Sequence, residues 1–498
     1  MQKKILSSVS SQILYIFVAT LVGLALVPIT INMLGKLQYG VFELILSLIL
    51  IDMFLEFGIG STLVKYVPEY KHNKEKLKSF VWSYYYIKLI LTFIGFFIVC
   101  FIGFNFNTIF NVANIDNLED VKVAVYLFGL GLFISSTATT LDNYLKGYVY
   151  FGLTNIVRVF SLVLFFITIY IYYTQSVTYN IVDIAFIWFI LKPLFLLILL
   201  ILSLKRVDLQ FILKPVKFEY NIVYRTLKYM FGMTYIVMIA QLYNRLPKII
   251  IGIVLNPIYV AYWGIMEKIK EPLLQLNNSL IRPLIPILSD RENFNKLDKK
   301  KILLINRFQY LFISFLGIMT ISHIKLFISL WLGNGYDDVI NIIKIILIAF
   351  LFPNAGVFLM MYYAEGKTKI NTIFVTSNTI VSLTLGTILL LVTKDINIFA
   401  WSFSIILIVM SFINIFRYTK YFKISNINFI KDSILPPFMM VIIFFIINCF
   451  ISQYFSFNLF GLVSSIFISV FIYILLFFIF MKSEDKQLLL KIRKKRLD

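Results

Sequence analysis

Charged residues are scarce in this sequence, and histidine and cysteine are nearly missing from it. Only 14% of the 498 residues are Asp, Glu, Lys or Arg, against roughly a quarter in soluble proteins. His72 and His323 are too few for a histidine metal site or a catalytic triad. Cys100 and Cys449 fall inside or at the ends of apolar runs, which excludes a disulfide framework. A soluble enzyme with a membrane anchor is therefore excluded, and we expect no metal or cofactor.

Apolar residues fill the chain from end to end and make up 60% of it. A membrane-spanning helix takes about 20 such residues. The sequence therefore predicts an all-α polytopic membrane protein with about 14 transmembrane helices. We expect spans at residues 11–34, 41–64, 80–104, 123–142, 155–173, 181–204, 229–254, 259–285, 306–332, 339–362, 370–393, 398–416, 434–452 and 460–481.

The positions of the basic residues set the orientation of these spans. Lys and Arg total 46 against 25 Asp and Glu. With the N-terminus inside, nearly all basic loop residues fall on the cytoplasmic side, and the outer side holds Lys36, Lys122 and Lys394. The positive-inside rule therefore predicts that both termini are cytoplasmic. The excess of positive charge orients the chain, and we expect no nucleic-acid partner.

The loops and an internal repeat divide the chain into two halves. The outer loops are too short for an extracytoplasmic catalytic domain, so no enzyme is expected. Residues Met33–Phe42 resemble Val254–Trp263, and both stand at the same point of their half. This predicts two pseudo-symmetric lobes around a central cavity. The expected parts are an N-terminal lobe at 1–204 with spans 1–6, a cytoplasmic linker at 205–228, a C-terminal lobe at 229–416 with spans 7–12, two extra helices at 417–481, and a basic cytoplasmic tail at 482–498.

Basic residues inside the spans carry the functional signal. Lys88, Arg158, Arg282, Arg307 and Lys344 stand near span ends, where long side chains reach the interface. Six lie deeper: Lys192, Arg245, Lys248, Lys268, Lys270 and Lys325. Each costs about 2.5 to 3.5 kcal/mol to insert. We therefore expect them to face a watery cavity or one another.

The spacing of these residues places them on shared helix faces. Arg245 and Lys248 fall on one face of span 7. Glu267 and Glu271 begin a polar stripe along span 8, and Lys268 and Lys270 flank it, within reach of Glu271 and Glu267 respectively. We interpret the set as a cationic cavity lining. The alternative is a self-neutralised polar seam that only joins helices.

Two acids in span 2, Asp52 and Glu56, stand one helical turn apart. Carboxylates this close in a poorly solvated place suit a carrier of protons or cations. Pairing with a cation from another helix, such as Lys192, is an equally good interpretation.

Two groups of short stretches carry a family resemblance: Gly40–Phe42, Glu56–Ser61 and Val64–Tyr70 in the first half, and Lys248–Gly252, Ala261–Gly264 and Pro283–Ser289 in the second. The first group looks like the first helical pair of bacterial polysaccharide (O-antigen) flippases, which belong to the multidrug/oligosaccharidyl-lipid/polysaccharide flippase superfamily. The second group is similar to the seventh and eighth helices of the same proteins. Members often carry an Asp before the Ile-rich run of span 7, whereas this chain has Asn244–Lys248 there.

The resemblance implies alternating access and an outward-moving undecaprenyl-diphosphate-linked oligosaccharide for surface polysaccharide synthesis. It implies a bacterial cytoplasmic (inner) membrane, contact with membrane lipids, and a polysaccharide polymerase and chain-length regulator as partners. Arg245, Lys248, Lys268, Lys270, Lys325 and Lys192 would hold the diphosphate, and the acidic set Asp52, Glu56, Glu267 and Glu271 would serve coupling or charge balance. A lipid II flippase and a small-molecule efflux antiporter remain as alternatives.

Overall fold

The computed structural model describes most of the chain as helices in two compact units. The described residues are 2–112, 115, 117–148, 150–176, 178–204, 215–281, 299–354, 356–357, 368–421, 429–454 and 458–480. Most of the expected linker, the stretch Pro283–Ser289, Arg282 and the basic tail lie outside these residues. The units, residues 1–268 and 269–498, are described separately below.

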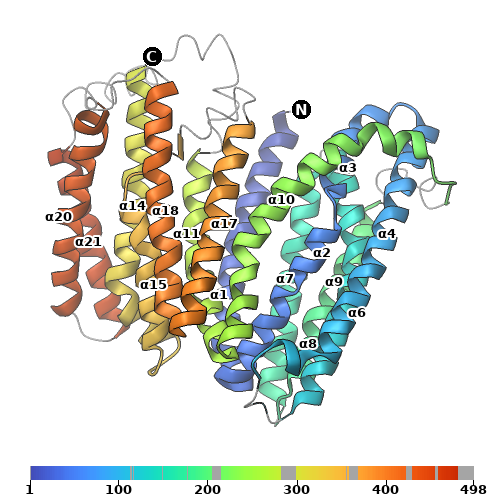
Figure 1. Ribbon diagram of the computed structural model, residues 1–498, viewed down its shortest axis with the longest axis horizontal. Coiled ribbons are helices and arrows are strands. Elements are labelled where there is room, and N and C mark those ends of the chain that lie inside the picture. The colour runs from blue at the N-terminus through green and yellow to red at the C-terminus, as the bar shows by residue number, and fades with distance from the viewer. Residues whose placement is uncertain are drawn as a thin grey trace. The chain divides into compact units, whose positions relative to one another are not determined.

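The first unit contains the helices of the first six spans and of span 7 (Figure 1). Its elements are α1 (Gln2–Ser47), α2 (Ile49–Leu55), α3 (Ile59–Tyr70), α4 (Lys74–Phe104), α5 (Phe106–Ile109), α6 (Leu118–Gly147), α7 (Phe151–Gln175), α8 (Ile181–Phe186), a π-helical turn η1 (Ile187–Leu191), α9 (Lys192–Leu204), α10 (Tyr220–Val254) and the first half of α11 (Pro257–Ile281). Helix pairs α1/α7, α4/α6 and α6/α9 pack side by side.

The second unit contains the rest of α11 and the helices of spans 9 to 14. Its further elements are α14 (Lys299–Trp331), α15 (Asp337–Ile348), η3 (Ala349–Leu351), α17 (Thr368–Thr393), α18 (Ile396–Tyr421), a π-helical turn η4 (Ile430–Ile434), α20 (Leu435–Tyr454) and α21 (Leu459–Phe480). Helix α20 packs against both α14 and α21, and α17 packs against α18.

The fold class predicted from hydropathy is confirmed. Where the structure describes them, the expected spans lie mostly on helix, and the described residues contain no strand. Eleven described segments are long and apolar enough to cross a membrane, and the first of them, Ser10–Leu55, joins spans 1 and 2. The chain is therefore a multi-pass membrane protein, with fourteen as an approximate number of spans.

Two breaks in the first pair of spans use glycine. Helix α1 kinks at Gly35, which has φ of 74° and ψ of 167°. Between α2 and α3, Gly58 adopts the left-handed region with φ of 65°, and its Cα lies against the backbone of α10 at Met230. An L-residue with a side chain would be strained at both positions. The kink at Gly35 falls between the expected spans 11–34 and 41–64, whereas the break inside the second of these spans was not expected.

The two copies of the repeated motif lie together in the first unit. Gly40 on α1 lies so close to the backbone carbonyl of Pro257 that a Cβ atom at this position would overlap it. Gly252 on α10 likewise leaves room for Leu44, and Gly264 on α11 leaves room for Glu43. Three glycines thus bring α1 close to the α10–α11 hairpin, and this close approach positions the site described below.

Candidate functional site

A buried ion cluster lies where α1 meets the α10–α11 hairpin. Lys248 Nζ on α10 lies 2.7 Å from Glu43 Oε2 on α1 and 2.7 Å from Glu267 Oε2 on α11. The side chains of Lys248 and Glu43 are each 2% exposed, and that of Glu267 is 11% exposed. Charges this deep are tolerated only when they are paired.

Two more side chains complete this cluster, which we call the Glu43 cluster (Tyr39, Glu43, Lys248, Glu267 and Lys268). The hydroxyl of Tyr39, one turn before Glu43, donates a hydrogen bond to Glu43 Oε1 at 2.9 Å. Lys268 Nζ lies 3.8 Å from the same oxygen, and its side chain is 35% exposed. The inner lysine is therefore held tightly by two carboxylates, whereas the outer lysine is held loosely by one.

Lys192 is placed next to this cluster by an irregular helix. The π-helical turn η1 ends at Leu191, and Lys192 begins α9. Single π-helical turns inside α-helices occur often at functional sites. The Nζ atom of Lys192 lies 5.6 Å from the ring centre of Trp188 and 6.0 Å from that of Phe165. It also lines a pocket of about 260 Å³ between α7 and α9.

The electrostatic surroundings of Lys192 are positive. The charged groups that act on it are Lys268 and Arg158, which are both cations. Among the described residues no carboxylate pairs with Lys192. Arg245, one turn before Lys248, adds a further positive charge beside the cluster, and its Nε has no hydrogen-bond partner among the described residues. Lys192, Arg245 and Lys268 are therefore the part of this unit best suited to receive an anion.

The acids of span 2 belong to a separate group on α2. Asp52 Oδ1 lies 3.0 Å from Lys88 Nζ on α4, and the Lys88 side chain is 3% exposed. Asp52 thus pairs with Lys88 rather than Lys192, and the expectation that Lys88 extends to the interface is wrong. Glu56 lies within electrostatic reach of both residues.

A third ion group ties α6 to α7. Asp142, 2% exposed, pairs with Lys146 at 2.7 Å and also with Arg158. Arg158 also lies over the ring of Tyr15 on α1, 5.9 Å from its centre. One carboxylate is thus shared by two cations, which leaves this group with a net positive charge.

The remaining predicted residues lie in the second unit. Lys270 Nζ is 4.0 Å from Glu271 Oε1 on α11, and Lys325 is exposed on α14. The structure therefore brings Lys192, Arg245, Lys248, Lys268 and Glu267 into one region of the first unit. Lys268, expected within reach of Glu271, pairs instead with Glu43.

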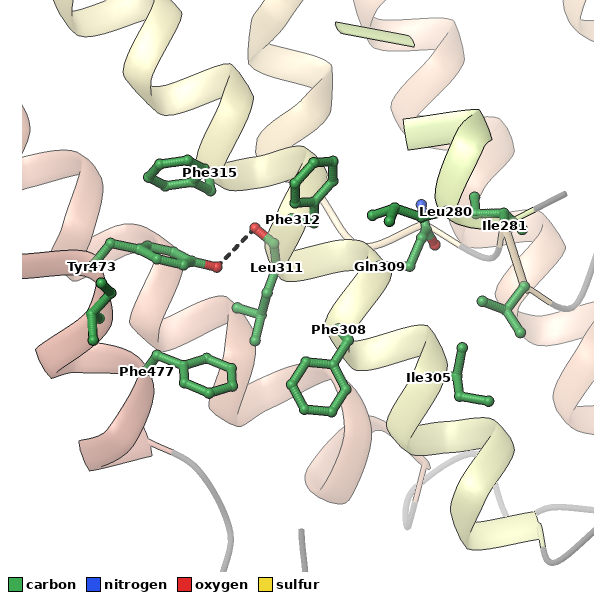
Figure 2. Close-up of a pocket in the computed structure, with 12 residues that line it drawn as sticks. Leu280, Ile281, Ile305, Phe308, Gln309, Leu311, Phe312, Phe315, Tyr473 and Phe477 are labelled. Carbon is green, nitrogen blue, oxygen red and sulfur yellow. Dashed lines mark hydrogen bonds between the residues drawn. The ribbon is translucent and has the colours of Figure 1, made fainter. Parts of the chain in front are cut away.

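The second unit holds an apolar pocket of about 440 Å³ (Figure 2). Phe308, Leu311 and Phe315 project into it from α14, and Tyr473 and Phe477 from α21. The Tyr473 hydroxyl donates a hydrogen bond to the Leu311 carbonyl at 3.0 Å, which closes one side. The carboxamide of Gln309 is the polar exception in this lining. Such a pocket suits a hydrocarbon chain.

Sequence reasoning missed Glu43 and Asp142, the two most buried acids of these groups. Glu43 stands two residues inside the predicted start of span 2 and directly follows the first copy of the repeat. Its spacing of four residues from Tyr39 was the available signal. Asp142 stands at the predicted end of span 4, and Lys146 follows it at the same spacing.

Comparison with solved structures defines the class of the fold. The lipid II flippase MurJ in an inward closed conformation matches with a TM-score of 0.69 at 14% identity, covering 94% of this chain and 98% of the other. A MOP superfamily transporter from Pyrococcus furiosus matches with a TM-score of 0.52 at 15% identity, covering 84% and 94%. The multidrug transporter DinF-BH matches at 0.55 and 14%, covering 84% and 96%. The fold is thus that of MOP superfamily transporters.

Comparison of the sequence with protein families gives the identification. The model of the polysaccharide biosynthesis protein family matches residues 5–292, which is more than half of the chain. The chain therefore belongs to the polysaccharide biosynthesis protein family. None of the curated proteins matches it.

Proposed function

We propose that this protein flips undecaprenyl-diphosphate-linked oligosaccharide repeat units, such as those of O-antigen, outward across the bacterial cytoplasmic membrane by alternating access. The observation that carries the proposal is Lys192, a membrane-embedded cation whose charged neighbours Lys268 and Arg158 are also cations. Lys268 and Arg158 have carboxylate partners in Glu43 and Asp142, whereas Lys192 has none among the described residues. An anion close to Lys192 would stabilise its charge, and a diphosphate supplies one.

Within this proposal the predicted residues take different roles. Lys192, Lys268 and Arg245 hold the diphosphate, because their charges are not matched by tight pairs. Lys248 forms ion pairs with Glu43 and Glu267, so its proposed role is to hold these side chains in place rather than to bind the diphosphate. Lys270 and Lys325 are weaker members of the cationic set. Asp52 and Glu56 remain the proposed coupling acids, now together with Lys88, and Glu271 balances Lys270.

The apolar pocket of the second unit supports a lipid-linked substrate. Its lining of Phe, Leu and Ile side chains matches a polyprenyl chain and offers almost nothing to a free sugar. The pocket therefore favours a substrate with a hydrocarbon chain over a free sugar. The proposal also places both termini in the cytoplasm and names a polysaccharide polymerase and a chain-length regulator as partners that act after the substrate is flipped.

A lipid II flippase is the second candidate. The likeness of the fold to MurJ favours it, and lipid II presents the same diphosphate and polyprenyl chemistry. A small-molecule efflux antiporter for organic cations is less well supported, because Lys192 and its cationic neighbours would repel such a substrate.

The test is a flipping assay with the purified full-length protein in liposomes. Undecaprenyl-diphosphate oligosaccharides of different sugar composition, and lipid II, are loaded on one side, and an impermeant sugar-modifying probe reports their arrival on the other. A double Lys192→Gln and Lys268→Gln variant should lose about 10-fold or more in rate, since each charged hydrogen bond to phosphate contributes about 1.5 to 3 kcal/mol. Lys122→Gln, which removes a cation from an exposed pair, is the matched control.

Three outcomes are informative. Transport of repeat units that falls in the double variant supports the function and the headgroup site. Transport restricted to lipid II moves the protein to the second candidate. Absence of transport of any diphosphate lipid, with binding of organic cations instead, refutes both proposals.

A further inference from the structure

Glu43 is the acid that contacts both lysines of its cluster, and its two oxygens have different surroundings. Oε2 receives the inner Lys248 at 2.7 Å in a fully buried pair. Oε1 receives the Tyr39 hydroxyl at 2.9 Å and the outer Lys268 at 3.8 Å. Oε2 therefore forms a buried structural ion pair, whereas Oε1 contacts Lys268, which is proposed above to bind the substrate.

The pairing of Lys268 with Glu43 is weak enough to be exchanged. Its separation exceeds normal hydrogen-bond length, and its side chain is 35% exposed, against 2% for Lys248. The positive charge of Lys192 also repels Lys268. A diphosphate carries more negative charge than one carboxylate and binds lysine without competition from Tyr39.

We propose that Glu43 is an internal substitute for the substrate phosphate. In the empty protein it holds Lys268, and an arriving diphosphate displaces it. Glu43 is thus a positioning residue that sets the affinity of the headgroup site. The inference rests on the proposed function and adds to it a residue whose loss tightens binding.

The exchange has a consequence for release. Binding must break the contact between Lys268 and Glu43, so the carboxylate lowers affinity for the substrate. When the substrate dissociates, the Glu43 carboxylate pairs with Lys268 again, and this competition raises the dissociation rate. Removing the charge of Glu43 should therefore lower both the Kd and the rate of flipping.

Tyr39 provides a change in the opposite direction. Its hydroxyl shares Oε1 with Lys268 and so weakens the hold of Glu43 on that lysine. Without the hydroxyl, Oε1 is fully available to Lys268, and the substrate meets stronger competition. Tyr39→Phe should therefore weaken binding, whereas Glu43→Gln should strengthen it.

The experiment measures binding of undecaprenyl diphosphate without sugars to the full-length protein in lipid nanodiscs, together with the flipping rate. Glu43→Gln keeps the shape of the side chain, and Lys248 keeps Glu267 as a partner. We expect its Kd to fall about 2- to 5-fold, the range for a partly exposed ion pair, and its flipping rate to fall as well. Tyr39→Phe should raise the Kd about 2-fold. Glu119→Gln, from an exposed pair, and Tyr172→Phe, from an exposed hydrogen bond to Asp183, are the matched controls without effect.

A double-mutant cycle with Lys268→Gln separates this role from a structural one. In the Lys268→Gln background, Glu43→Gln should no longer change the Kd, because the exchanged lysine is gone. A Glu43→Gln protein that binds as wild type does, or more weakly, overturns the inference. If Glu43→Gln fails to fold, the sign of the Tyr39→Phe shift decides. A wild-type protein that binds no undecaprenyl diphosphate refutes the proposed function itself, which distinguishes the two failures.

Discussion

The two units bury different kinds of polar group. Among the described residues, the fully buried or nearly buried Lys, Asp and Glu side chains all lie in the first unit: Glu43, Lys88, Asp142, Lys248 and Glu267. The buried polar side chains described in the second unit are Asn, Gln, Ser, Thr and His, for example Gln309 and Asn448.

This difference indicates which part of a charged lipid each unit is suited to bind. A buried ion must be paired, so the first unit contains opposed charges that an anionic headgroup can exchange with. Uncharged amides and hydroxyls need only hydrogen bonds, and they leave the second unit free to build a pocket with an apolar lining. In the function proposed above, the charged groups of the first unit would recognise the headgroup, and the apolar pocket of the second unit would suit a hydrocarbon chain.

Among the predicted changes, the loss of Lys248 from the buried ion pairs of the first unit should have the largest effect on stability. Lys248→Met leaves Glu43 and Glu267 buried without their shared cation. We expect the free energy of unfolding to fall by about 3 to 5 kcal/mol, as for other buried pairs that lose one partner. Thermal unfolding in detergent measures the change, with Lys122→Met as the exposed control.

A neutral triple variant sharpens this prediction. Glu43→Gln, Glu267→Gln and Lys248→Met together remove the three buried charges and leave only the partly exposed Lys268, so most of the lost stability should return. A single Lys248→Met protein as stable as wild type would show that the cluster is solvated and not a buried ion group.

The close approach that builds the Glu43 cluster can be tested with two glycines of one helix. Gly40→Ala places a methyl group against the Pro257 carbonyl, and the backbone must move. We expect a loss of about 1 to 3 kcal/mol, typical of overpacking. Gly23→Ala on the same helix meets no atom within 4 Å, and should stabilise the helix by up to about 1 kcal/mol. Equal effects of the two changes would contradict the packing of α1 on the hairpin.

Hydropathy predicted the helices of both units, because an apolar run long enough to cross a membrane has few alternatives to helix. The breaks within runs were harder to predict. Gly58 forms a break because α10, more than 150 residues later in the chain, lies against it. Periodicity within one span carries no information about such a distant contact.

The candidate site was predicted in part for the same reason. Deep cations such as Lys192 and Lys248 were identified, because an unpaired charge in a span is costly wherever it points. Which of them is neutralised depends on the tertiary contact of Glu43 with α10 and α11. The sequence places Glu43 near a span end, where an acid is ordinarily solvated, and only the glycines that close the gap make it buried.

The smallest expected effect concerns the apolar pocket of the second unit and the rate of flipping. Ile474→Trp on α21 fills part of the apolar pocket of the second unit, whereas Phe478→Trp on the same helix changes an exposed side chain outside the pocket lining. Flipping of a long-chain polyprenyl substrate should fall about 5-fold in the first variant, because overpacking costs about 1 kcal/mol or more. Binding of a short-chain prenyl diphosphate should stay unchanged, since the residues proposed to hold its headgroup, chiefly Lys192, Arg245 and Lys268, are not part of this pocket lining. A loss of short-chain binding in Ile474→Trp would mean that the pocket also affects binding of the headgroup, which would contradict the proposal that this pocket binds only the hydrocarbon chain.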